Sequence, residues 1–121
     1  MTDRTAYATA LDHDTDVLLR AFNARHATKA DGLTKAEAAR LYDIPERRFR
    51  AAVAKLREQG EPIVSWSEEG STYRMARDAA EAERFIDTEL LPRIGHLQRQ
   101  VRNIRIGIPV RFKVHQERLI G

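Results

Sequence analysis

Positively charged side chains gather in one short stretch of the chain, between Pro45 and Gln59. The stretch holds Glu46 and Glu58 as acids, and its basic residues are Arg47, Arg48, Arg50, Lys55 and Arg57. Guanidinium and ammonium groups attract polyanions at short range, and arginine suits bidentate contacts with phosphate or guanine. These residue types predict an anion-binding surface, with nucleic acid as the first candidate ligand.

Other chemistries lack the residues they need. The sequence has no cysteine, which excludes disulfides and thiolate sites. Asp12, Asp14 and Asp16 alternate as in a calcium loop, but the glycine and glutamate that such a loop requires are absent. No metal-ligand spacing, glycine-rich phosphate loop or serine nucleophile is recognisable. We therefore expect no enzyme, no metal and no cofactor, and we interpret the three aspartates as arm and helix-cap residues.

The basic stretch is expected to form a helix from Pro45 to Gln59. Its apolar residues define one buried side: Phe49, Ala52, Val53 and Leu56. The opposite side is slim because it contains two alanines: Arg47, Ala51, Ala54 and Glu58 lie there. A slim face fits the major groove of DNA, where Arg47 reaches base edges. The flanking residues Arg48, Arg50 and Lys55 are expected to contact bases or phosphates.

Neighbouring elements are predicted from local signals. A first helix is expected near Thr15 or Asp16, and the capping-box sequence Thr34-Lys35-Ala36-Glu37 starts a second helix at Lys35. That helix stops at Asp43-Ile44, because residues before Pro45 avoid the helical region. The β-prone runs 63–67 and 71–75 predict a hairpin. Trp66 in the first run is interpreted as a core residue, with stacking on a base as the alternative.

This order of elements resembles a winged helix-turn-helix. The segments 32–41 and 44–56 carry the resemblance, which covers Thr15 to Ala76 and is closest to the amino-terminal domains of the biotin ligase repressors. Small phage and bacterial regulators are similar too. The resemblance implies binding of double-stranded DNA through the third helix. The sequence departs from the family in the connection, where Asp43 and Pro45 replace a glycine and a serine, and at the hairpin tip, where acidic side chains would repel phosphate.

The predicted DNA-contacting residues lie on the second and third helices and on the second hairpin strand. They are Thr34, Lys35, Glu46, Arg47, Arg48, Arg50, Ala51, Lys55 and Arg74.

A long helical pattern follows from Asp78 to Ile106. Apolar residues recur in it at alternating intervals of four and three, the spacing of a helix that meets another helix: Leu90, Ile94, Leu97, Val101 and Ile104. We expect these residues to mediate homodimerisation, with folding back on the first helix as the alternative. Pro92 predicts a kink or two consecutive helices. Beyond Ile106 the chain is expected to be a basic tail or, at 110–114, an edge strand.

The expected fold is mainly α with a small β-hairpin, a winged helix-turn-helix followed by a long C-terminal helix. Its parts are a flexible arm at 1–13, the winged domain at 14–77, the long helix at 78–106 and the tail at 107–121. Arg93 to Gly121 holds 7 Lys/Arg against 1 acid, so this region is expected to add phosphate contacts.

The predicted function is sequence-specific binding of double-stranded DNA, used in transcriptional regulation. We expect a cytoplasmic homodimer without a membrane segment or a small-molecule substrate. One alternative is a winged-helix adaptor or inhibitor that binds protein in a replication or other nucleic-acid complex. The other is sequence-independent nucleic-acid binding through the basic tail, with the winged domain as a scaffold.

Overall fold

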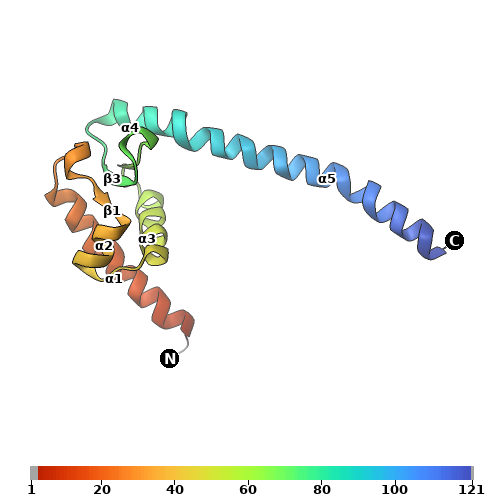
Figure 1. Ribbon diagram of the computed structural model, residues 1–121, viewed down its shortest axis with the longest axis horizontal. Helices are drawn as coiled ribbons and strands as arrows, with labels where there is room; N and C mark the ends of the chain where they lie inside the picture. The colour runs from red at the N-terminus through yellow and green to blue at the C-terminus, as the bar shows by residue number, and fades with distance from the viewer. Residues whose placement is uncertain (1–2, 121) are drawn as a thin grey trace. The chain divides into compact units, whose positions relative to one another are not determined.

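The fold is mainly helical, with a small three-stranded antiparallel sheet and a long C-terminal helix (Figure 1). This computed structural model describes the backbone of residues 3–120 and the side chains of residues 4–111. The chain forms two compact units that divide between Phe85 and Ile86. The first unit contains α1 (Asp3–Ala24), β1 (Leu33–Thr34), α2 (Lys35–Tyr42), α3 (Glu46–Glu58), β2 (Ile63–Val64), β3 (Thr72–Met75) and α4 (Ala79–Phe85). The second contains a π-helical turn (Ile86–Leu90) and α5 (Leu91–Ile120).

The core of the first unit lies between α1, α2, α3 and the sheet. Its buried side chains include Leu18, Phe22, Leu33, Ile44, Phe49, Leu56 and Ile63. The strand order is β1-β3-β2, with Leu33 opposite Tyr73 and Ile63 opposite Met75. In Figure 1, α1 and α3 lie side by side, and their contact is the most extensive between two helices of this unit. This packing fixes one flank of α3 against α1.

The predicted second and third helices are confirmed. The Thr34 hydroxyl accepts a hydrogen bond from the Glu37 backbone N–H at 3.0 Å, and the Glu37 carboxylate accepts one from the Thr34 N–H at 3.2 Å. This capping box starts α2 at Lys35. In α3 the four predicted apolar residues are all buried, while Pro45 and Gln59 flank the helix as its caps.

The connection between α2 and α3 places Asp43 in the left-handed region, at φ 55° and ψ 39°. Asp43 thus adopts the conformation that glycine usually supplies at a helix C-terminus. Ile44 follows it and is buried in the core, which anchors the turn. The Ile44 N–H also donates to the Ala38 carbonyl at 3.3 Å.

The predicted hairpin is present with shorter strands, and it has an additional partner. β2 and β3 lie within the two expected runs, and the residues between them include a 3-10 turn at Ser67–Glu69. β1 pairs with the other edge of β3, and no pattern in the sequence predicted this third strand. Trp66 is 6% exposed and meets the Phe85 ring edge-on at 5.6 Å between centroids, so its predicted place in the core is confirmed.

Both ends of the chain differ from the predictions. α1 begins at Asp3 rather than near Thr15, so helix extends over most of the segment expected to be an arm, and Asp12, Asp14 and Asp16 lie inside a helix instead of capping one. α5 continues to Ile120 through Pro109, which replaces the expected tail and rules out an edge strand at 110–114. A helix that has already nucleated extends at little cost per residue, which helps it continue through poor formers.

The long helical pattern is divided, as Pro92 suggested. α4 ends at Phe85, and the wider π-helical turn at Ile86–Leu90 leads into α5, so that Pro92 lies in the first turn of the new segment. Proline lacks an N–H to continue the hydrogen-bond ladder, and its position near a helix start limits that loss.

Candidate nucleic-acid interface

The outward face of α3 is open along its length. Arg47, Ala54 and Glu58 are exposed and Ala51 is half-buried, as expected from their position opposite the core residues. Within the part of the chain whose side chains are described, no hydrogen bond or ion pair holds the Arg47 guanidinium. A slim surface led by one unpaired arginine therefore faces solvent.

One flank of α3 is tied to α1 by acids. Arg48 Nε donates to Asp14 Oδ2 at 2.8 Å, and Arg48 Nη2 donates to the Asp43 carbonyl at 3.4 Å. Asp14 is 1% exposed, so the buried negative charge of its carboxylate depends on Arg48 to compensate for the loss of water. The hydrogen bond that Arg48 donates to the Asp14 carboxylate raises the pKa of Arg48 above its usual value. Arg48 therefore mainly links α3 to α1, and it is less available than Arg47 for contact with a ligand.

Lys55 lies on the same flank and pairs with Asp12 of α1. This pair differs from the previous one because Asp12 is largely exposed. Exposed ion pairs contribute about 0–1 kcal/mol, which a phosphate can match or exceed. Lys55 therefore remains available to a polyanion, whereas Arg48 does not exchange its partner as readily.

On the opposite flank, Glu46 joins two cations. Its carboxylate accepts from Lys35 Nζ at 3.0 Å and lies 2.8 Å from Arg50 Nη2. The hydrogen bond from Lys35, together with the charges of Lys35 and Arg50, lowers the pKa of Glu46 below its usual value. Arg50 stays well exposed. The structure thus brings these three predicted residues together where α2 and α3 both begin.

Thr34 lies beside this cluster, but its hydroxyl accepts the capping hydrogen bond described above. A shallow pocket between the starts of α2 and α3 is lined by Thr34, Lys35, Ala36, Ala39, Glu46 and Ser71. Glu46, at the start of α3, lines this pocket, which therefore adjoins the candidate surface.

Arg74 is a correction to the predicted interface. Its side chain is 5% exposed and donates to both oxygens of Glu81 at 2.7 Å and to both oxygens of Glu69 at 3.0 Å. These carboxylates raise the pKa of Arg74, and they leave no surface from which it could reach DNA. The sequence pattern of a hairpin strand did not reveal this, because both acids lie outside the strand.

Glu69 therefore has a structural role at the hairpin tip, while Glu68 is exposed there. Arg57 also serves the fold: Arg57 Nε donates to the Ile63 carbonyl at 2.9 Å, and its guanidinium lies 5.1 Å from the Phe85 ring centre. The hairpin tip and Arg57 therefore add no available cation to the surface formed by α3 and the start of α2.

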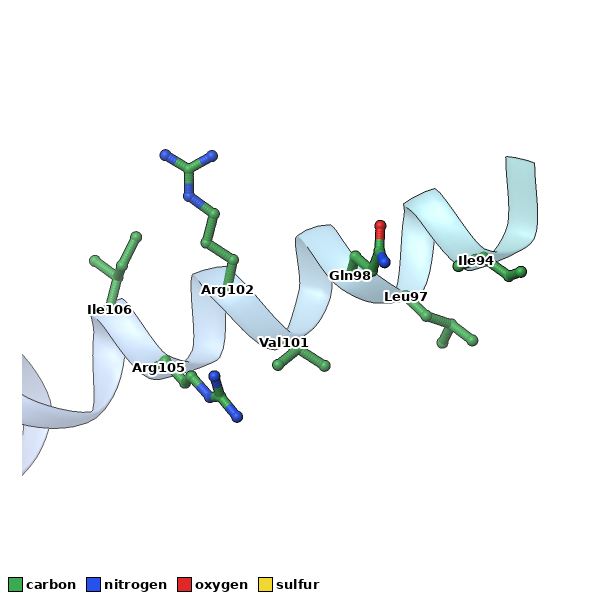
Figure 2. Close-up of a pocket in the computed structure, with 7 residues that line it drawn as sticks. All are labelled: Ile94, Leu97, Gln98, Val101, Arg102, Arg105 and Ile106. Carbon is green, nitrogen blue, oxygen red and sulfur yellow. The ribbon is translucent and has the colours of Figure 1, made fainter. Parts of the chain in front are cut away.

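A second candidate surface lies on α5, in the other unit. The predicted contact residues Ile94, Leu97, Val101 and Ile104 are all exposed, and Leu90 is half-buried. An open pocket along this helix is lined by the seven residues that Figure 2 labels: Ile94, Leu97, Gln98, Val101, Arg102, Arg105 and Ile106. Leu97, Val101 and Arg105 project to one side in this view, and Arg102 and Ile106 to the other.

Comparisons with known proteins give no relative: no family model, no curated protein and no solved structure matches this chain. Over the residues described, no helix combines the length and apolar character needed to cross a bilayer. The same residues contain no cluster of three or more histidine or acidic side chains placed to hold a metal ion.

Proposed function

We propose that this protein is a winged helix-turn-helix protein that binds double-stranded DNA with α3 in the major groove, and that it acts as a small cytoplasmic transcriptional regulator. The order α1-β1-α2-α3-β2-β3 and the strand order β1-β3-β2 support the winged-helix assignment. In such a fold the second helix positions the third against DNA.

The observation that carries the proposal is the outward face of α3. Arg47 lies at its amino-terminal end, unpaired among the described side chains, and Ala51 and Ala54 follow it without bulk. A helix enters the major groove when its leading face is slim, and an arginine there can donate to O6 and N7 of guanine. Arg50 and Lys55, on the two flanks, are placed to exchange exposed carboxylates for phosphates.

A protein-binding adaptor is the second candidate. The acidic hairpin tip and the pairing of Arg48, Lys55, Arg50 and Lys35 with acids of the same chain favour it. Three of these four pairs involve an exposed carboxylate on Asp12 or Glu46, where an exposed pair contributes little. We therefore rank DNA binding first.

The test is selection of a preferred sequence from a random duplex pool, followed by titrations at several salt concentrations. Arg47→Ala should lower the preference for the selected sequence over random duplex by about 1–3 kcal/mol, because a bidentate base contact is lost. Arg20→Ala removes an exposed arginine of α1 and is the matched control. If no duplex binds at low salt, the adaptor is correct. The third possible result is binding without sequence preference. If Arg47→Ala leaves this binding unchanged and Arg99→Gln weakens it, the interaction belongs to the basic C-terminal helix.

The same titrations test the role of Asp12. Asp12→Asn removes the carboxylate that competes with phosphate for Lys55, so affinity for any duplex should rise. Asp16→Asn removes an equal charge from an exposed site of the same helix and controls for the general change in net charge. Equal effects of the two substitutions would contradict a specific role for the Asp12–Lys55 pair.

A further inference from the structure

The apolar seam of α5 is regular and uncovered. Its residues follow one another at intervals of four and three: Leu90, the last residue of the π-helical turn, is followed by Ile94, Leu97, Val101, Ile104 and Ile108 of α5. Within the seam Ile94 is 50%, Leu97 58% and Ile104 63% exposed. A heptad seam keeps an apolar stripe on one side of a helix so that it can be buried against another helix. The described residues provide no such cover for it.

The residue types in the seam specify how many helices should meet. Heptad positions a are occupied by Ile94, Val101 and Ile108, all branched at Cβ. Positions d carry Leu90 and Leu97, then Ile104. β-Branched residues at a combined with leucine at d favour a parallel two-stranded coiled coil, and the heptads that contain Leu90 and Leu97 have this combination.

The charges beside the seam are compatible with a second copy of the same helix. Between Leu91 and Arg111 there are five arginines and no acid, so a homodimer must avoid direct arginine pairs. In a parallel, in-register pair, position g of one helix faces position e of the partner in the next heptad. Arg93 then faces Gln98, and Gln100 faces Arg105, so each guanidinium meets an amide. Arg99 and Arg102 fall on the outer side of the pair.

We propose that α5 pairs with α5 of a second copy as a parallel, in-register, two-stranded coiled coil along Leu90 to Ile108. Gly107 and Pro109 mark its end, because proline removes a backbone donor and distorts the helix. The two cationic helices repel each other, so added salt should strengthen the dimer by screening. This salt dependence is opposite in sign to that of DNA binding, and the pairing does not require DNA.

The first experiment measures the mass of the full-length chain by light scattering. We expect twice the mass of one chain, and a dissociation constant that falls as salt is added. Val101→Asp should raise that constant roughly 100-fold or more, since it buries a carboxylate of each copy in the seam. Asn103→Asp introduces the same charge on the outer side and should leave the constant nearly unchanged. Trp66 is the only tryptophan and lies in the other unit, so unchanged Trp66 emission shows that the first unit stays folded.

The second experiment fixes the orientation and uses the absence of cysteine from the chain. Under mild oxidation, Ile104→Cys should crosslink to itself, because equal positions meet in a parallel pair. Asn103→Cys should not crosslink. A dimer in which Ile104→Cys crosslinks only with Ile94→Cys is antiparallel and overturns the proposal. A monomer at all salt concentrations also overturns it, and binding of that monomer to phosphatidylserine vesicles would identify a membrane surface as the occupant of the seam.

Discussion

The guanidinium of Arg74 lies between Glu69 and Glu81, and all three side chains are largely withdrawn from water. Arg47, in contrast, is exposed and unpaired among the described side chains. Two arginines that look alike in the sequence therefore have different roles, one holding β3 to α4 and the other available to a ligand. Glu81 is the centre of the first arrangement, since the Arg77 backbone N–H also donates to it at 2.7 Å.

Removing the Glu81 carboxylate should destabilise the first unit strongly. In Glu81→Ala the buried Arg74 keeps only Glu69 as an acidic partner, and we expect the free energy of unfolding to fall by about 3 kcal/mol. Glu83→Ala, at an exposed site of the same helix, should change it by less than about 0.5 kcal/mol. Urea unfolding followed by Trp66 emission measures both. Similar losses in the two variants would show that the buried pair contributes nothing specific.

The same carboxylate makes the stability depend on pH. The hydrogen bond from Arg74 lowers the pKa of Glu81 from 4.5 to about 2, so the folded state binds its proton less readily than the unfolded state. Its stabilising contribution is therefore complete above pH 4.5 and is lost as the pH falls toward 2. The stability gap between wild type and Glu81→Ala should accordingly be wider at about pH 6 than at about pH 3.

At the scale of elements, the connection between α2 and α3 determines how the outward face is presented. Asp43 there occupies a left-handed conformation that costs a non-glycine residue about 1–2 kcal/mol. Its carbonyl oxygen accepts from Arg48, and its N–H donates to the Ala39 carbonyl at 3.2 Å. The backbone groups of Asp43, more than its side chain, therefore stabilise this turn.

We therefore expect Asp43→Gly to raise the melting temperature slightly or leave it unchanged, because glycine adopts φ > 0 without strain. Asp43→Val should lower the free energy of unfolding by about 1–2 kcal/mol, since a β-branched residue tolerates this region poorly. Asp43→Asn removes the charge while still tolerating the left-handed region, and it isolates the electrostatic contribution. Equal stabilities of the glycine and valine variants would contradict this account of the turn.

At the scale of the whole molecule, the two proposals combine into one expectation. A dimer presents two copies of α3, and dimeric helix-turn-helix proteins bind two half-sites. Sequences selected by the wild type should contain a repeated motif, and Val101→Asp should bind single motifs and paired motifs with nearly equal affinity per site. Asn103→Asp should retain the wild-type preference for paired motifs. Selection of a single, unrepeated motif by the wild type would show that the dimer does not place two copies of α3 on the same duplex.

Much of the first unit could be predicted because the relevant signals are local. The capping box at Thr34, the stop before Pro45 and the spacing from Phe49 to Leu56 act within one or two helical turns, so they need no tertiary context. The first turns of α1 escaped prediction because their side chains, from Arg4 to Thr9, are all exposed and show no apolar period. The segment beyond Ile106, expected to be a tail or an edge strand, is also helical, since α5 continues to Ile120.

By itself, the sequence determined which helix carries the cations, which side of it is slim and which residues form the seam of α5. Only the tertiary structure decided which cations are available. Arg48 is engaged by Asp14, which is 34 positions away in the chain, and Arg74 by a glutamate on α4. Charge pairing depends on chain segments that meet only in the folded state, and periodicity within a single segment contains no information about it.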